Sequence, residues 1–418
     1  MFTTRSFSSM LMFCFFVAAS HVQGQNMQVH FINVGQGSAT LIEFPCGVIL
    51  IDTGGETNEL FQSSDALIAY LDDFFLKRPD LNSSIDLLII SHPHLDHTQS
   101  IRDVADRYTI KNAITNGQIT GSGKTGQKFL HTLIADREDT PATNDDIGYF
   151  EGISSDIPAG GVTNNIIDPI NCDGADPVIK LLWGRVPTNP GWSKDDFEDE
   201  NNHSIVCKID FGQSSLITTG DLETKAIGAL MAKHNNTSVF DSDVCLVGHH
   251  GSKNGATAPF INAVSPEIAV LSFGNPDREL IWTAWAHGHP NQEIVNMLAS
   301  KVSKTRPTTT VKVGLAAKSF TTMQLSKAVY GIGWDNSVVL TATLNGEWSN
   351  KSEQGQLNIN EADLVALQTL PSIGATRAQA ILTHRGSIGR FNDMSDVDDV
   401  PGIGPATVTL LRPLIRFQ

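Results

Sequence analysis

The chain has 418 residues, of which 40% are hydrophobic and 18% are charged. This length and composition exclude a mini-protein and a disordered chain, and they predict two or three folded domains. The 45 acidic and 29 basic residues give a net charge of -16, which excludes a protein that coats nucleic acid through a broad basic face.

The amino-terminal segment is typical of a secretory signal peptide. Arg5 precedes an apolar run at residues 10–19, which is too short to span a bilayer, and small or neutral residues follow at 22–24. We therefore expect residues 1–24 to be a signal peptide, and the mature protein to be periplasmic or extracellular without a membrane anchor. A buried first helix is the alternative, but the run has no polar face.

Four cysteines remain after removal of this segment: Cys46, Cys172, Cys207 and Cys245. In an oxidising compartment one or two disulfides are expected, with three pairings if all four join. Cys207 and Cys245 lie in apolar, strand-like runs, so free buried thiols are the alternative for them.

Short apolar runs separated by turn residues predict strands from residue 27 onwards. We expect antiparallel strands at residues 29–34, 39–44 and 48–51, a helix at 65–75, and a buried strand at 85–90. Further apolar strands are expected at 204–209, 215–218, 244–247 and 268–271. Loops that follow such buried strands are where α/β and sandwich proteins place their chemistry.

The composition changes near residue 350. Residues 349–356 read as a polar linker, and residues 357–418 as short helices. Two similar tetrapeptides, PSIG at 371–374 and PGIG at 401–404, interrupt these helices and indicate an internal repeat. We therefore expect one domain at residues 25–348 and a second, all-α domain at residues 357–418.

The strongest chemical signal is the sequence HPHLDH at residues 92–97, directly after the expected strand at 85–90. It places the imidazoles of His92, His94 and His97 and the carboxylate of Asp96 within six residues. At the end of a rigid strand these groups can converge on a divalent cation such as zinc. A surface histidine cluster without a metal is the alternative.

Further polar residues lie at the ends of other expected strands: His203, Asp221, Glu223, His249 and His250. A lone histidine is as often structural as it is a ligand. Together, however, these residues form a convergent set, because all of them lie at ends of expected core strands.

The order of these motifs, with DTGG at 52–55, carries a family resemblance. It resembles the metallo-β-lactamase superfamily, an α/β fold in which an αββα sandwich of two mixed sheets holds a dinuclear metal centre along one edge. VGQG at 34–37, NHS at 202–204, HHGS at 249–252 and GHP at 288–290 are similar more narrowly to the soluble nuclease-like domain of the ComEC family of DNA-uptake proteins. This similarity covers roughly residues 27–345.

The resemblance implies two divalent metal ions, zinc by preference with manganese as the alternative. The first ion would be held by His92, His94 and His203. The second would be held by Asp96, His97 and one histidine of the 249–250 pair, with Asp221 bridging both ions. We favour His250 as the ligand, and the choice between the two histidines stays open.

The resemblance also implies roles around the metals. Asp52 would orient a ligand histidine. The expected catalytic residues are Asp96, Asp221, His249, Glu223 and His289, of which His249 and Glu223 would face the substrate. His287 is as good a candidate for substrate contact as His289, which also fits a buried structural role.

The implied reaction is hydrolysis of a phosphodiester in DNA by a hydroxide that bridges the two ions and is oriented by Asp221. His249 or His289 would stabilise the oxyanion or protonate the leaving group. His94 stands where ComEC-like domains often carry an acidic residue, and no membrane-spanning part is found, so we expect a free-standing hydrolase. The alternatives are an esterase of phosphorylated small molecules or surface polymers, and a DNA-binding or docking module on an inactive hydrolase scaffold.

The carboxyl-terminal repeat resembles the paired helix-hairpin-helix domain of the DNA receptor family ComEA. Its turns would bind phosphate through backbone N–H groups at helix amino termini and read no base. The expected DNA contacts are Ser372, Ile373, Gly374, Arg377, Gly402, Ile403 and Gly404. Ser372 replaces the first glycine of one hairpin, so that copy is expected to bind less well. A protein-docking helical module is the alternative.

Three further features carry less weight. GSGKT at 121–125 lacks the leading glycine of a phosphate loop, so no nucleotide triphosphate site is expected. The acidic run at 195–200 is interpreted as a solvated loop, with calcium binding or substrate gating as remote alternatives. Trp282 and Trp285 could line a cleft near His287, although packing in the core is the commoner role of such aromatic residues.

Overall fold

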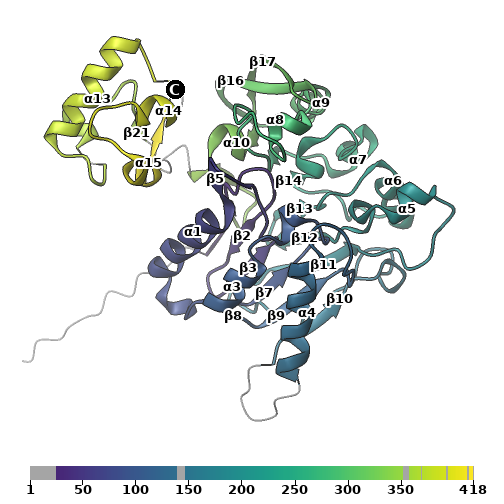
Figure 1. Ribbon diagram of the computed structural model, residues 1–418. Coiled ribbons are helices and arrows are strands. Elements are labelled where there is room, and N and C mark those ends of the chain that lie inside the picture. Colours follow the sequence, from purple (N-terminus) through teal and green to yellow (C-terminus); the bar gives the residue numbers. More distant parts are fainter. Residues whose placement is uncertain are drawn as a thin grey trace, which may run out of the picture.

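The computed structural model describes residues 25–138, 146–351, 357–368, 370–391, 394–411 and 414–417. The expected signal peptide, residues 1–24, and most of the expected linker lie outside the described residues. Two β-sheets and their flanking helices make up the body of the molecule (Figure 1). Among the helices of the described ranges, none is both long and apolar enough to cross a membrane.

The first sheet has eight strands and is mixed. In spatial order they are β10 (Gly148–Glu151), β9 (Asn112–Thr115), β7 (Leu87–Ile89), β3 (Val48–Ile51), β2 (Thr40–Glu43), β1 (Asn26–Phe31), β19 (Val338–Thr343) and β20 (Trp348–Asn350). β3, β7, β9 and β10 are parallel, and the remaining pairs are antiparallel.

The second sheet has six strands. They are β11 (Val178–Trp183), β12 (Val206–Phe211), β13 (Ser214–Thr218), β14 (Val244–Val247), β15 (Ile268–Leu271) and β18 (Val329–Gly331). β13, β14, β15 and β18 are parallel, so their carboxyl ends lie along one edge. A long hairpin of β16 (Thr305–Ala316) and β17 (Ser319–Lys327) follows the helix α9 (Gln292–Lys301) in the chain.

Three buried clusters hold the layers together. The alternation of side chains in β3 shows the arrangement, because Ile49 and Ile51 join the cluster between the sheets, whereas Val48 and Leu50 face the first helical layer. That layer consists of α1 (Ser63–Lys77), α3 (Ile101–Arg107) and α4 (Lys124–Glu138). The second sheet is covered by α6 (Thr224–Lys233), α7 (Ala258–Val264) and α9 (Gln292–Lys301) (Figure 1). The predicted αββα sandwich is confirmed.

Shorter elements complete the body. They are α2 (Leu95–Thr98), α5 (Lys194–Glu198), α8 (Ala284–His287), α10 (Ile332–Asp335), the short helical turns η1 (Pro79–Leu81), η2 (Ser154–Asp156), η3 (Glu200–His203) and η4 (His249–Gly251), and the two-residue strands β4 (Thr57–Asn58), β5 (Phe61–Gln62), β6 (Ser84–Ile85) and β8 (Thr109–Ile110). Because β20 belongs to the first sheet and ends at Asn350, the body extends two residues past the expected boundary at residue 348.

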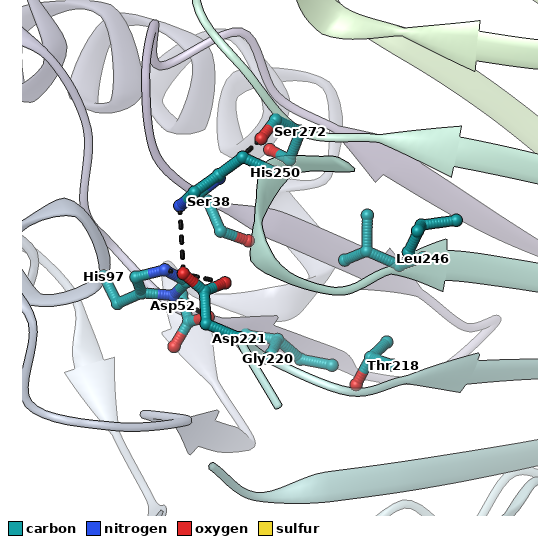
Figure 2. Close-up of a pocket in the computed structure, with 11 residues that line it drawn as sticks. Ser38, Asp52, His97, Thr218, Gly220, Asp221, Leu246, His250 and Ser272 are labelled. Carbon is teal, nitrogen blue, oxygen red and sulfur yellow. Dashed lines mark hydrogen bonds and ion pairs between the residues drawn. The ribbon is translucent and has the colours of Figure 1, made fainter. Parts of the chain in front are cut away.

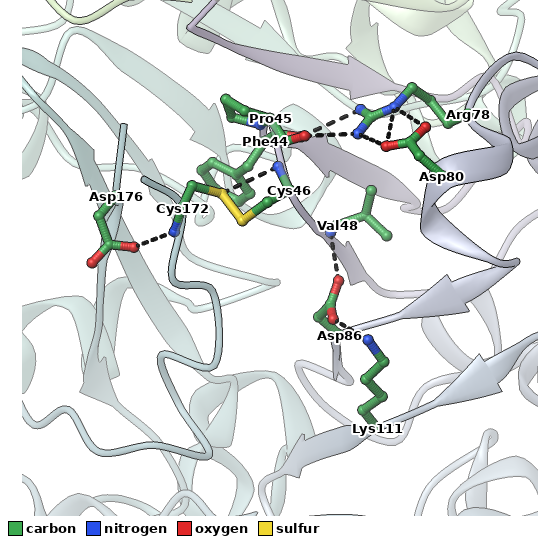
Figure 3. The surroundings of a disulfide bond; sticks show 10 residues. All are labelled: Phe44, Pro45, Cys46, Val48, Arg78, Asp80, Asp86, Lys111, Cys172 and Asp176. Carbon is green, nitrogen blue, oxygen red and sulfur yellow. Dashed lines mark hydrogen bonds and ion pairs between the residues drawn. A yellow bond between two sulfur atoms is a disulfide. The ribbon is translucent and has the colours of Figure 1, made fainter. Parts of the chain in front are cut away.

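One disulfide joins two distant parts of the body. Cys46, in the turn between β2 and β3, is bonded to Cys172, which lies 126 residues later (Figure 3). Cys207 in β12 and Cys245 in β14 are buried free thiols. The structure therefore has one of the expected disulfides, and the remaining two cysteines follow the alternative of free thiols.

The carboxyl-terminal residues form a helical unit with its own core. Its elements are β21 (Leu357–Asn358), α12 (Leu364–Leu367), α13 (Ala375–Ile388), α14 (Met394–Asp398), α15 (Pro405–Leu411) and β22 (Ile415–Arg416), and the two short strands pair in parallel. Leu367, Ile381, Phe391 and Leu411 are fully buried within it. The expected all-α domain is thus present, with one small pair of strands added.

Candidate metal centre

Loops from both sheets meet at one edge of the sandwich. Asp52 follows β3, the 92–97 loop follows β7, Asp221 follows β13, and the histidine pair 249–250 follows β14. Figure 2 shows that His97, Asp221 and His250 turn toward one another there. The structure therefore brings these three residues together at the strand ends.

Asp52 fixes the orientation of His97. Its Oδ1 accepts a hydrogen bond from the Ser91 backbone N–H at 2.8 Å, and its Oδ2 accepts one from the Ser91 hydroxyl at 2.9 Å. The same Oδ2 lies 2.7 Å from His97 Nδ1. His97 therefore carries its proton on Nδ1, which leaves Nε2 facing Asp221 Oδ1 at 3.3 Å.

Gly54 lets the loop at 92–97 come close enough for these contacts. A Cβ atom at Gly54 would lie 1.9 Å from the carbonyl carbon of Asp96, which no side chain tolerates. Two backbone hydrogen bonds hold the approach, from Thr53 N–H to the His97 carbonyl at 2.9 Å and from Ser38 N–H to the Asp96 carbonyl at 3.0 Å. The DTGG sequence at 52–55 thus positions the loop at 92–97 through Gly54 as well as through Asp52.

His250 is oriented in a similar way. Its Nδ1 donates to the Ser272 carbonyl at 2.6 Å, so its Nε2 faces the carboxylates of Asp96 and Asp221, each at 3.1 Å. The residue has a left-handed backbone, with φ at 53°. Of the histidine pair, His250 is the buried member whose Nε2 reaches the cluster.

Asp96, His97, Asp221 and His250 form a group that fits a divalent cation. Their potential ligand atoms all lie within 4.8 Å of one another. The Nε2 atoms of His92 and His97 are buried without a hydrogen-bond partner, which is rare for polar atoms in proteins. Imidazole nitrogens and carboxylate oxygens in this arrangement are zinc ligands in many proteins.

The charged side chains of this group determine which of its members carry protons. Burial disfavours the charged form of His250, but the adjacent carboxylates of Asp221 and Asp96 outweigh it and raise the pKa of His250 to about 10. Burial also raises the pKa of the Asp221 carboxyl, but His250 and His97 hold that pKa well below its ordinary value. The carboxylates are therefore ionised, and the histidines carry protons that a bound cation would displace.

A second group surrounds His94. Its Nε2 lies 3.5 Å from Glu200 Oε2, and the ring of His92 lies 4.7 Å from its own ring. His94, Asp199 and Glu200 offer ligand atoms within 4.8 Å of one another. The sequence predicts a solvated loop at this acidic run and does not mark Glu200 and Asp199 as candidate ligands; their position just before His203 is the available signal.

His203 is not brought into either group. Its Nδ1 accepts a hydrogen bond from the Val186 N–H at 3.0 Å, and its Nε2 donates to the Phe197 carbonyl at 2.7 Å. Both ring nitrogens are thus used by the backbone, and burial lowers the pKa of this histidine. In this structure His203 supports the loop that presents Glu200.

The other expected substrate-facing residues flank the cluster. His249 Nδ1 lies 3.3 Å from Glu223 Oε1, which also accepts a hydrogen bond from Asn201 at 3.1 Å. The ring of His289 lies 5.9 Å from that of His249 and 6.0 Å from that of His250. Burial raises the pKa of Glu223.

The two hairpin turns of the carboxyl-terminal unit have matching geometry. Ser372 and Gly402 both have positive φ, at 61° and 88°, and the following Ile373 and Ile403 are buried. A Cβ atom added to Gly374, Gly402 or Gly404 would meet nothing within 4 Å, so the glycine faces are open. Arg377 donates to the Ser372 carbonyl at 2.8 Å and so braces its turn.

Comparison with protein families defines the class of the protein. The metallo-beta-lactamase superfamily matches residues 32–275, which is more than half of the chain, and the helix-hairpin-helix motif matches residues 352–416. The chain therefore belongs to the metallo-β-lactamase superfamily and carries a helix-hairpin-helix motif.

Three curated proteins are similar to parts of the chain. Competence protein ComA of Neisseria gonorrhoeae is 29% identical over 194 residues, which cover 44% of this chain and 25% of that protein. ComE operon protein 3 of Bacillus subtilis is 27% identical over 287 residues, which cover 65% and 30% of the two chains. ComE operon protein 1 of Bacillus subtilis is 33% identical over 76 residues, which cover 18% and 37%.

The chain thus spans only 25% and 30% of the length of the first two relatives. The similarity confirms the resemblance that the motifs predicted.

Proposed function

We propose that the protein is an exported, metal-dependent phosphodiesterase that cleaves DNA. The observation that carries this proposal is the convergence of Asp96, His97, Asp221 and His250 at the strand ends, on a chain that also has a helix-hairpin-helix motif. The similarity to competence proteins supports DNA as the substrate.

The proposed ligands divide between two ions. Asp96, His97, Asp221 and His250 would hold one ion. His92 and His94 would hold the other, together with Glu200 in place of His203, because Glu200 faces His94 whereas the backbone occupies both ring nitrogens of His203. The added carboxylate suits manganese as well as zinc.

When bound, the two ions would activate the attacking water and stabilise negative charge on the phosphoryl oxygens. Asp221 is placed to orient that water, because its two carboxylate oxygens face His97 and His250 from one side of the cluster. Glu223 orients the ring of His249, which can protonate the leaving oxygen. His289 packs beside His250 and limits how the substrate approaches.

The helix-hairpin-helix unit is proposed to hold the DNA backbone through its two open turns. Backbone N–H groups at a helix amino terminus bind phosphate without reading sequence. The space above Gly374, Gly402 and Gly404 allows such a close approach. Deletion of residues 357–418 should therefore weaken DNA binding while leaving metal binding intact.

Export is supported by two features. The amino-terminal segment has the composition of a signal peptide. The disulfide between Cys46 and Cys172 requires an oxidising compartment in most organisms.

The test is a comparison of substrates for the purified protein supplied with Zn²⁺ or Mn²⁺. We expect cleavage of at least one of two DNA substrates, a plasmid and a single strand, and this cleavage should stop when a chelator is added. Hydrolysis of a small phosphodiester with both DNAs left intact would favour the esterase alternative and overturn the nuclease.

A further inference from the structure

An exposed aromatic surface lies beside the proposed metal centre. Trp282 is 74% exposed and its neighbour Ile281 is 72% exposed. Both belong to the loop between β15 and α8. The helix α8 in turn ends at His287, where the segment His287–His289 begins. Packing in the core, the commoner role considered for Trp282, is therefore excluded by the structure.

A series of aromatic rings connects Trp282 to the cluster. The ring of His250 stacks on that of His289 at 6.0 Å, and His289 stacks on His287 at 5.4 Å. His287 in turn lies 6.2 Å from Trp282. A row of neighbouring aromatic rings thus runs from His250, a proposed metal ligand, to the exposed Trp282.

The loop that presents Trp282 is anchored. The Thr283 hydroxyl contacts the carbonyls of Arg278 and Leu280 at 2.8 and 2.7 Å. The Arg278 guanidinium lies 4.2 Å from the centre of the Phe61 ring and 3.2 Å from the buried carboxylate of Glu56. Trp282 itself has φ at 61°, which is strained for a bulky residue, and such strain is common where a side chain is held for function.

A positive charge lies next to Trp285, three residues after Trp282 in the chain. Lys318, in the turn between β16 and β17, donates its backbone N–H to the Trp285 carbonyl at 2.8 Å. Its ammonium lies 5.3 Å from the centre of the Trp285 ring. Aromatic faces next to a cation are the combination that binds single-stranded nucleic acid, by stacking bases and by contacting phosphate.

We propose that Trp282 and His287 form a stacking platform for unpaired bases, and that the substrate strand of the metal centre is single-stranded. This inference rests on the proposed function and specifies its substrate class. Only an unpaired, unstacked base can cover an exposed indole, since bases inside a duplex are stacked on their neighbours. Stacking needs no net charge, so it suits a body whose residues 25–350 carry a net charge of -16.

The first experiment measures kcat and KM of the full-length, metal-loaded protein on a single-stranded oligonucleotide and on an abasic strand of equal length. Trp282→Ala should raise KM for the oligonucleotide about tenfold and leave kcat unchanged, the effect expected when one stacking contact is lost. The abasic strand should not distinguish the variant from the parent. Trp282→Phe should restore most of the affinity.

Ile281→Ala is the matched control, because it removes an equally exposed apolar side chain without a ring. It should behave as the parent. Equal KM values for Trp282→Ala and the parent protein would overturn the platform, as would an equal loss with Ile281→Ala. A change of oligomeric state in Trp282→Ala, without a change in KM, would show that this surface binds protein instead.

A second measurement separates the platform from the nuclease. A single strand that contains iodouracil is photo-cross-linked to the full-length protein, and the linked peptide is identified by mass spectrometry. We expect cross-links at Trp282 with the single strand but not with a duplex. Cross-links at Trp282 without any cleavage would contradict the proposed function alone, whereas cross-links confined to residues 357–418 would overturn the platform.

Discussion

Single atoms decide which residues of the proposed centre are ligands. His97 and His250 each have Nδ1 held by an oxygen, so each turns Nε2 toward the carboxylates. His203 uses both ring nitrogens and turns neither toward the cluster. A sequence motif shows that a histidine is present, but these hydrogen bonds decide its role.

Asp52 provides a test at this scale. Asp52→Asn keeps the shape of the side chain but removes the charge that holds the proton on His97 Nδ1, so metal affinity should fall about 10- to 100-fold. Titration against a competing chelator measures the change. Asp73→Asn, at an exposed carboxylate on α1, is the control and should bind metal as the parent does. Unchanged affinity in Asp52→Asn would contradict the orienting role.

Substitutions of Glu200 and His203 should have opposite effects on the number of bound metal ions. Glu200→Gln should lose one of two bound ions after dialysis, as measured by elemental analysis. His203→Ala should keep both ions but lose about 1–3 kcal/mol of stability, because two buried backbone groups lose their partners. Loss of an ion from His203→Ala alone would restore the ligand set that the family resemblance implied.

At the scale of elements, the strands that are buried on both faces are the ones whose bounds the sequence predicts best. The strands at 48–51, 244–247 and 268–271 were predicted to the residue, because both faces of each are buried and their ends are marked by turn residues. The first strand was predicted at 29–34 but ends at Phe31, since the apolar pattern continues through Ile32 and Val34 after the pairing stops. β10, β19 and β20 were not predicted, because their apolar residues are fewer or alternate.

A buried ion pair ties β2 to the end of α1. Glu43 contacts Arg78 and lies 3.4 Å from His30. Burial raises the pKa of the Glu43 carboxyl, but His30 and Arg78 outweigh it and hold the pKa below its ordinary value. Its contribution to stability is therefore present above about pH 4.5 and is lost as the pH falls further.

Glu43→Gln should accordingly destabilise the protein by about 1–3 kcal/mol at neutral pH, because the buried Arg78 guanidinium loses one of its two carboxylate partners and keeps only Asp80. Denaturant unfolding measures the loss, which should shrink in acid. Glu198→Gln, which breaks an exposed pair with Lys194, should change stability by about 0–1 kcal/mol. Equal effects of the two substitutions would show that the buried pair contributes no more than a surface one.

At the scale of the whole molecule, the disulfide joins two parts of the chain that are 126 residues apart. Cys46→Ser or Cys172→Ser should each lower the free energy of unfolding by about 2–5 kcal/mol, since the bond closes a loop of 126 residues. Thermal unfolding with and without a reducing agent measures the effect. Cys245→Ser, at a free buried thiol, is the control: it keeps the disulfide, so the reducing agent should lower its stability as it lowers that of the parent, whereas the stability of Cys46→Ser should not respond.

The negative charge is distributed unevenly along the chain. Residues 25–350 carry a net charge of -16, whereas residues 351–418 carry only -1. The acidity therefore belongs to the body, where a polyanion would be repelled except near bound cations. The proposed binding of DNA would then depend on short-range contacts, which act within a Debye length of about 8 Å.

The most direct test of the account is the cleavage of a single-stranded oligonucleotide by the full-length protein loaded with Zn²⁺ or Mn²⁺. The account predicts cleavage by the parent protein and by Asp210→Asn, a control at a half-exposed carboxylate of β12. Asp221→Asn should reduce the rate at least about 100-fold, because Asp221 faces both His97 and His250. An intact oligonucleotide with the parent protein, or an undiminished rate with Asp221→Asn, would contradict it.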